Sequence, residues 1–149
     1  MDMSGTTLAL EPADEGTLDY VESLLEANGL PTSDVRSKPW CFHVAYDGDE
    51  RVGVGGVETC GAAGLLRSVA VERSTRGEGL GTAICERLET VARDSGIETL
   101  YLLTTTAPGF FAGLGYVEID RSETPEGIRE TTEFADLCPE SAVCMRKRL

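Results

Sequence analysis

Three glycines at alternate positions, Gly77, Gly79 and Gly81, separate an apolar run of strand length from a run with helical spacing. Such a turn exposes backbone N–H groups that have no intrahelical partner and lie at the positive end of the helix dipole. These N–H groups bind anions, and phosphate above all. Arg76 stands beside the turn and can donate a charge-assisted hydrogen bond to the same anion. We therefore expect a phosphate site over residues 76–82.

Three kinds of glycine-rich phosphate loop compete for this stretch. A Walker-type loop needs Gly-Lys-Ser/Thr, and the stretch contains no lysine. A dinucleotide-binding turn needs G-x-G-x-x-G directly after its strand, but Thr82 replaces the third glycine and the loop from Val71 to Gly77 is too long. The pattern Arg-x-x-Gly-x-Gly, from Arg76 to Gly81, remains. A glycine turn that only lets a helix pack closely against a strand is the structural alternative.

The elements on either side must position this turn. The run Leu65–Val71 predicts a buried strand before it, and Gly96 ends the helix that follows it. The predicted apolar face of that helix is formed by Ile84, Cys85, Leu88, Val91 and Ala92. The predicted polar face is formed by Glu86, Arg87, Glu89, Thr90, Arg93 and Asp94.

The rest of the chain predicts short strands and helices within one domain, residues 1–149. A first helix is expected to open at Pro12 and Asp14 and to close at Asn28-Gly29, with Leu18, Val21, Leu24 and Leu25 on its buried face. Further strands are expected at 6–10, 40–46, 51–59, 98–104, 116–120 and 141–148, and a short helix at 109–114. Residues 122–139 are expected to be irregular, apart from a turn of helix near 131–137. The glycines Gly53, Gly55 and Gly56 indicate a bulge or a close backbone approach.

Charge and composition exclude several classes of protein. The net charge of −13 repels nucleic acid and anionic membranes. The hydrophobic content of 41% favours a globular chain, and no apolar run reaches spanning length. Without a signal-peptide pattern, we expect a soluble, cytoplasmic protein. Only Lys38 and Lys147 are lysines, and a highly acidic, lysine-poor surface is typical of salt-adapted proteins.

The five cysteines predict neither zinc nor disulfides. No C-x-x-C pair occurs and His43 is the only histidine, so we expect no metal site. The odd number of cysteines and the missing secretion signal favour reduced thiols, most of them buried as small apolar residues.

The strand, the Arg76–Gly81 pattern and the helix resemble the pyrophosphate-binding motif of the GCN5-related N-acetyltransferase (GNAT) superfamily, and so does the block from Phe110 to Tyr116. The resemblance implies a mixed α/β (α+β) fold, with a mostly antiparallel sheet of six to seven strands, splayed fourth and fifth strands, and about four flanking helices. LLRSVAV, YLLTTTA before Phe110-Phe111, and LCPESAVCM together resemble the arsenic-resistance (ArsN-type) N-acetyltransferases. This closer resemblance implies a small-molecule amine acceptor, with a link to arsenic resistance and arsenic contact by Cys138 as hypotheses.

The resemblance implies that acetyl-CoA is the cosubstrate, with its pantetheine arm beside the fourth strand and its pyrophosphate on the glycine turn. The contacts implied in this way are Val69, Ala70, Val71, Arg76, Gly77, Glu78, Gly79, Leu80, Gly81, Thr82, Thr104 and Phe111. A backbone N–H of Val69 or Val71 would stabilise the oxyanion. Homodimers are common among similar proteins, so the resemblance is compatible with a homodimer.

The sequence indicates the general acid and the general base less clearly than it indicates the cosubstrate site. Many superfamily members carry a tyrosine at the position of Phe111, and protein-acetylating members carry a glutamate at the position of Leu65. The remaining candidates for the thiolate proton are Thr104, Thr105 or water, and Tyr116 is expected to pack in the core. Glu58 and Glu72 are candidate bases through water, with solvated carboxylates as the alternative.

Arg67 interrupts an apolar strand and, by two-residue alternation, would share a face with Val69 and Val71. A buried arginine needs an anionic partner. It would either bind an acidic group of the acceptor or form an ion pair with Glu58. The leading hypothesis is thus a small-molecule N-acetyltransferase, and the alternative is a catalytically silent acetyl-CoA-binding module.

Overall fold

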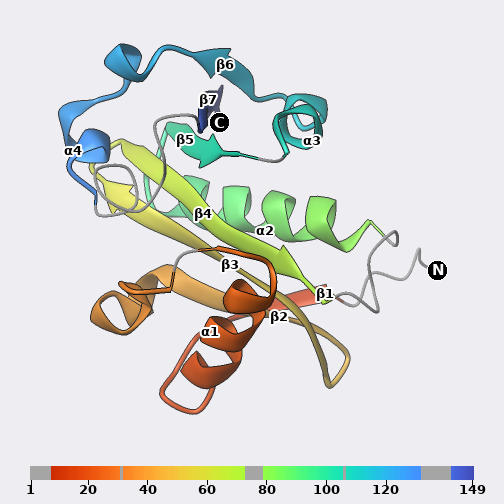
Figure 1. Ribbon diagram of the computed structural model, residues 1–149. Helices are drawn as coiled ribbons and strands as arrows, with labels where there is room; N and C mark the ends of the chain where they lie inside the picture. The colour runs from red at the N-terminus through yellow and green to blue at the C-terminus, as the bar shows by residue number, and fades with distance from the viewer. Residues whose placement is uncertain (1–7, 31, 73–78, 106, 132–141) are drawn as a thin grey trace. The chain divides into compact units, whose positions relative to one another are not determined.

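The computed structural model describes residues 8–30, 32–72, 79–105, 107–131 and 142–149 (Figure 1). In chain order the elements are β1 (Leu8–Pro12), α1 (Leu18–Ala27), η1 (Val35–Ser37), η2 (Pro39–Cys41), β2 (Phe42–Asp47), β3 (Glu50–Cys60), β4 (Ala63–Val71), α2 (Leu80–Asp94), β5 (Thr99–Thr104), α3 (Pro108–Gly113), β6 (Val117–Ile119), η4 (Arg121–Glu123), α4 (Glu126–Arg129) and β7 (Val143–Arg148). None of the described helices is long and apolar enough to cross a lipid bilayer.

The strands form one seven-stranded sheet in the order β1-β2-β3-β4-β5-β7-β6. The pairs β1–β2, β2–β3, β5–β7 and β6–β7 are antiparallel, and β4–β5 is parallel. This confirms the predicted mixed α/β fold with a mostly antiparallel sheet. The chain divides into two compact units, one of Met1–Gly56 with Ser68–Leu88 and one of Val57–Arg67 with Glu89–Leu149.

The core of the first unit lies between α1 and the strands. Leu18, Val21, Leu24 and Leu25 are the buried face of α1, as predicted, and they pack with Phe42, Val44, Val54 and Ala70. The helix begins at Leu18, later than the sequence indicated. The backbone N–H of Thr17 donates to the Asp14 carboxylate, and that of Asp14 donates to the Thr17 hydroxyl. These side chains satisfy the backbone in a turn and so delay the helix.

Helix α2 approaches β3 closely at two glycines of the first unit. A Cβ added to Gly53 would lie 2.7 Å from the Ala70 carbonyl oxygen and 2.7 Å from Ile84 Cδ1, and one added to Gly55 would lie 2.5 Å from Leu88 Cδ1. The β2–β3 register also shifts between Ala45 and Tyr46. Both the close approach and the bulge that the glycines predicted are therefore present.

In the second unit, β5 pairs with β7 along its whole length, and β6 pairs with the other side of β7. Leu65, Tyr101, Ile128 and Cys144 form its core. Figure 1 shows α3 next to β6, which follows it in the chain.

Three further local predictions were wrong. The strand expected from Trp40 begins at Phe42, because Pro39–Cys41 forms a 3₁₀ turn. The stretch from Ser122 contains a 3₁₀ turn at Arg121–Glu123 and the helix α4; a capping box between Asp120 and Glu123 stabilises the turn. Glu89, expected on the polar face of α2, is buried. The helical turn expected over 131–137 lies almost entirely outside the described residues.

Gly53→Ala should lower the free energy of unfolding by about 1–3 kcal/mol, because its new methyl group meets the Ala70 carbonyl, which side-chain rotation cannot move. Urea unfolding measures the change. Gly109→Ala is the control, because no atom lies within 4 Å of its added Cβ. Equal midpoints for Gly53→Ala and the wild type would contradict the close packing.

Burial of His43 on β2 lowers the pKa of its imidazole, and its Nδ1 has no hydrogen-bond partner among the described residues. The unfolded chain therefore binds this proton more readily than the folded protein does, so stability should fall as pH drops below about 6.5. His43→Gln removes the titration, and its melting temperature should depend less on pH across that range than the wild type's. Identical pH dependence would contradict this assignment.

Candidate functional site

The predicted phosphate site begins at a left-handed glycine. Gly79 has φ = +77° and no atom lies within 4 Å of a Cβ built on it, so the chain uses a conformation that suits glycine, with open space beside it. Helix α2 starts at the next residue, and the N–H of Ala83 donates to the Gly79 carbonyl. The N–H groups of Leu80, Gly81 and Thr82 thus belong to the first helical turn. Arg76, Gly77 and Glu78 lie outside the described residues.

Strand β4 contains a second left-handed residue. Ser68 has φ = +60°, a conformation that is uncommon for any residue other than glycine, asparagine or aspartate. It directly precedes Val69, one of the two expected oxyanion donors. A left-handed residue interrupts the pleat, so the alternation that would place Arg67 on the face of Val69 and Val71 cannot be carried across it. Strain of this kind is concentrated at functional sites.

The pairing of β4 with β5 is short. It joins Ala63–Leu65 to Thr99–Tyr101 and does not continue to Leu66 or Arg67, although both strands run further. The end of the β4–β5 pairing at Leu65 agrees with the expected splay of the two strands.

Arg67 forms an ion pair with Glu58, which is one of the two roles predicted for it from the sequence. Its Nη1 donates to Glu58 Oε2 at 2.7 Å, and both residues are buried. A charge in this setting is tolerated only with such a partner. The other role, binding of an acceptor by Arg67, stays a prediction.

Glu72 follows β4 and is held by two contacts. Its backbone N–H donates to the Val52 carbonyl at 2.8 Å, and its Oε2 accepts a hydrogen bond of 2.8 Å from the Tyr20 hydroxyl. The Arg51 guanidinium lies 5.1 Å from the centre of the Tyr20 ring. Burial, followed by the hydrogen bond to Glu72, raises the pKa of Tyr20, so this phenol stays protonated and keeps donating.

Thr104 and Phe111 belong to the second unit. Thr104 is buried at the end of β5, and its Oγ1 accepts a hydrogen bond of 3.1 Å from the N–H of Ala107, the residue that caps α3. A hydroxyl can accept and donate at once, so this contact does not use the Thr104 proton. The Phe111 ring packs edge-on against Tyr116 at 5.8 Å between centroids. A phenylalanine cannot donate a proton.

Tyr116 is buried, as predicted, and its hydroxyl donates to Glu89 Oε2 at 3.0 Å. Lys147 Nζ contacts the other oxygen of the same carboxylate, Glu89 Oε1, at 2.9 Å. The sequence-based assignment of Glu89 to the polar face followed its charge, although its spacing of four residues from Cys85 and three from Ala92 places it at the border of the apolar face. The partners Tyr116 and Lys147 are distant in sequence, so no local pattern reveals them.

The cysteines agree with the expectation of buried thiols where they are described. Cys41, Cys85 and Cys144 are buried thiols, and Cys60 is a half-buried thiol. Burial raises the pKa of the Cys144 thiol to about 11, so it is neutral at ordinary pH. Cys138 lies outside the described residues. No group of His, Cys, Asp and Glu suited to a metal occurs in the part of the chain that the structure describes.

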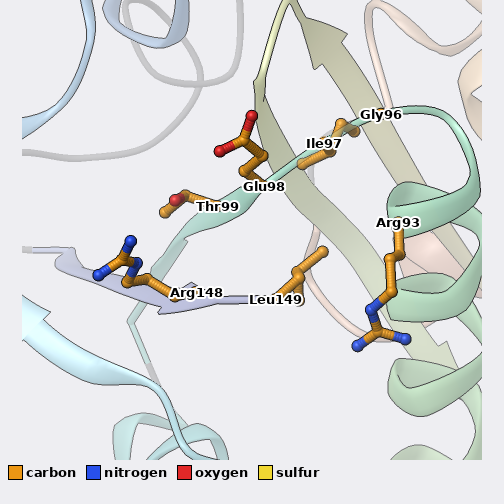
Figure 2. A pocket seen from close by; sticks show the side chains of 7 residues that line it. All are labelled: Arg93, Gly96, Ile97, Glu98, Thr99, Arg148 and Leu149. Atoms are coloured by element: carbon orange, nitrogen blue, oxygen red, sulfur yellow. The ribbon is translucent and has the colours of Figure 1, made fainter.

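A surface hollow of about 470 Å³ lies elsewhere, in the second unit, and Arg93, Glu98, Arg148 and Leu149 are among the residues that line it. Figure 2 shows Arg93 and Arg148 on opposite sides of Leu149, with their guanidinium groups directed apart. They do not converge on a shared anion, and the Glu98 carboxylate belongs to the same hollow. This hollow is therefore not a substitute for the expected phosphate site.

The fold and the glycine turn agree with a family match. The model of the acetyltransferase (GNAT) domain matches residues 38–118, which is more than half of the chain. The chain belongs to this family.

Individual relatives agree. The chain is 36% identical over 111 residues to an acetyltransferase of Bacillus subtilis, covering 70% of this chain and 76% of that one. It is 38% identical over 92 residues to the amino-acid acetyltransferase of Mycobacterium tuberculosis, covering 56% and 49%. Rv2747 from the same organism, solved in complex with CoA and NLQ, superposes with a TM-score of 0.79 at 25% identity and covers 95% of this chain and 99% of that one. The chain spans about half the length of two of the curated relatives it matches.

Arg67→Met should lower the free energy of unfolding by about 3–5 kcal/mol, because it leaves the buried Glu58 carboxylate without its charge partner. Chemical denaturation measures this. The double variant Arg67→Met/Glu58→Leu should recover much of the loss, since an apolar pair often replaces a buried ion pair without penalty. A double variant no more stable than the single one would show that the ion pair does not account for the loss.

Proposed function

We propose that the protein is an acetyl-CoA-dependent N-acetyltransferase that transfers the acetyl group to the amine of a small molecule. The observation that carries the proposal is left-handed Gly79 at the start of α2, eight residues after the end of β4, in the order that the family motif requires. The diphosphate would bind the N–H groups of residues 79–82 together with Arg76, Gly77 and Glu78, and the pantetheine arm would lie along Val69, Ala70 and Val71. The CoA bound to Rv2747 supports the choice of cosubstrate.

The direction in which acetyl-CoA would lie along β4 then shows which candidate residues could stand near the thioester. With the diphosphate beyond Val71 and the pantetheine arm running back towards Val69, the thioester lies on the Val69 side. Glu72 stands three residues away, about 10 Å along an extended chain. Its carboxylate also accepts the hydrogen bond of Tyr20. We therefore assign Glu72 to holding the entrance of the phosphate loop rather than to deprotonating the acceptor.

Acetyl-CoA supplies a thioester, whose carbonyl carbon an amine attacks. The N–H of Val69 or Val71 would donate to the oxygen that becomes negative in this step, and left-handed Ser68 would set the direction of the Val69 N–H. Thr104 and Thr105 are the remaining side-chain candidates to protonate the departing thiolate, because Phe111 has no hydroxyl and the Tyr116 hydroxyl is committed to Glu89. An ordinary thiol pKa near 8.5 also lets the thiolate leave with little assistance. Since no carboxylate is assigned as base, the acceptor would enter as the neutral amine.

An amino acid or a similar amine that carries a carboxylate, reacting in its neutral-amine form, is the acceptor class that we favour. The name of the Mycobacterium tuberculosis relative supports it. Arg67 is the residue proposed to bind the acceptor carboxylate, which would then share the guanidinium with Glu58. The similarity to the ArsN-type subfamily adds arsenic-containing amino acids to the acceptors worth testing.

Several wider assignments accompany this proposal. The two compact units would work as a single domain in the cytoplasm, without nucleic-acid or membrane partners, and a homodimer is compatible with it. The net charge of −13 supports the exclusion of polyanionic partners and a salt-adapted surface. A catalytically silent acetyl-CoA-binding module is the second candidate, and phenylalanine at 111 with leucine at 65 favours it.

A thiol-release assay with acetyl-CoA and a panel of amino acids, simple amines and arsenical amino acids should show turnover with at least one acceptor. Gly79→Ala should weaken acetyl-CoA binding at least about tenfold in calorimetry, because a methyl group at φ = +77° obstructs the diphosphate.

Gly29→Ala is the matched control. Gly29 also has φ = +69° and open space around its Cβ position, so the substitution imposes the same backbone strain away from the site. Its acetyl-CoA affinity should equal the wild type's. Binding without turnover would favour the silent module, and wild-type protein that does not bind acetyl-CoA would overturn both candidates.

A further inference from the structure

Buried Glu89 and Tyr116 and half-buried Lys147 form a cluster in the second unit, here called the Glu89 cluster. Glu89 comes from α2, Tyr116 lies between α3 and β6, and Lys147 comes from β7. The Glu89 carboxylate accepts from the Tyr116 hydroxyl at 3.0 Å and from Lys147 Nζ at 2.9 Å, one contact on each oxygen. Lys147 Nζ also lies 5.6 Å from the centre of the Tyr116 ring.

Burying the charged groups of the Glu89 cluster requires desolvation free energy. Glu89 is 6% exposed, and a carboxylate in that position must be paired and hydrogen-bonded to be tolerated. Apolar residues of similar volume often serve stability equally well. Only two lysines occur in a chain of net charge −13, and one of them is placed here. The arrangement therefore points to a role in positioning rather than in stability.

The cluster holds the end of α3. None of the side chains of α3, Pro108–Gly113, is buried, so the helix has little packing of its own. Its Phe111 ring rests edge-on against the Tyr116 ring, and the Phe111 carbonyl accepts a hydrogen bond of 3.1 Å from the Tyr116 N–H. Gly115, at φ = +101°, turns the chain beside the Lys147 stem. The position of Phe111 thus depends on Tyr116, and that of Tyr116 on Glu89.

We propose that the Glu89 cluster positions α3 for acetyl-CoA, with Tyr116 and Glu89 as positioning residues that act through Phe111. The inference rests on the proposed function, in which Phe111 contacts the cosubstrate. The tyrosine hydroxyl, buried and directed at a carboxylate, serves the geometry of the site and donates no proton to the reaction. A cofactor site whose walls are fixed in advance binds with a smaller loss of conformational freedom.

Tyr116→Phe keeps the ring and removes the hydroxyl that fixes it. The KM for acetyl-CoA should rise about five- to tenfold, with the KM for the amine acceptor within about twofold of wild type. Lys147→Met keeps the stem beside Gly115 and removes the charge. It should likewise raise the KM for acetyl-CoA and leave the KM for the amine acceptor nearly unchanged. Steady-state kinetics with each substrate varied in turn, together with calorimetric binding of acetyl-CoA, measures the effect.

Thr124→Val is the matched control in the same unit. Thr124 is buried and its hydroxyl donates to the Arg121 carbonyl at 2.6 Å, so the variant also loses one buried hydroxyl contact, outside α3 and the cluster. It should keep both KM values.

If Tyr116→Phe and Lys147→Met melt at lower temperatures but keep the wild-type KM and affinity for acetyl-CoA, the cluster is purely structural and the inference is wrong. Equal increases of the acetyl-CoA KM in Thr124→Val would also overturn it, because general loosening would then account for the effect. Failure of the proposed function appears separately, as wild-type protein that does not bind acetyl-CoA.

Discussion

Strand β4 must satisfy two demands, and the proposed site depends on how it does so. Its first residues pair in parallel with β5, whereas the backbone near Val69 has to remain available for a ligand. Left-handed Ser68 stands between these two parts of the strand. Such a residue re-aims the N–H groups that follow it without ending the strand, so β4 continues as a strand to Val71 while the direction of the N–H groups proposed to bind substrate changes at one strained position.

Successive turns of helix α2 likewise have different roles. Its first turn follows left-handed Gly79 and presents N–H groups, while Ile84 and Leu88 approach β3 so closely that a side chain at Gly53 or Gly55 would require neighbouring atoms to shift. The glycines of β3 thus set how closely the helix approaches that strand. The next turn contributes Glu89, a charged residue in the interior, and this carboxylate connects α2 to Tyr116 and Lys147.

Cations are scarce in this acidic chain, and several of them form specific contacts with other side chains. Arg67 pairs with buried Glu58, Lys147 pairs with buried Glu89, and Arg51 lies over the ring of Tyr20. Carboxylates removed from water require such partners, whereas those on the surface do not. Buried carboxylates are thus paired while the net charge stays strongly negative. The proposed phosphate ligand would therefore have to be bound by local N–H groups against the negative field of the whole chain.

The sequence by itself determined the order of the elements, the buried face of α1, the close approach at the β3 glycines and the family, because these features depend on local spacing and on glycine conformation. The phosphate turn stays a prediction from the sequence, made because three glycines at alternate positions before a helix leave several backbone N–H groups open to an anion. Only the tertiary structure decided that Glu89 is buried, that Arg67 pairs with Glu58 and that Glu72 accepts the Tyr20 hydrogen bond. Each of these contacts joins residues that are apart in sequence, and a polar residue carries no local sign of whether its partner will be water or another side chain. The left-handed Ser68 was equally hidden, because serine does not mark such a conformation as glycine does, and only the surrounding sheet holds it there.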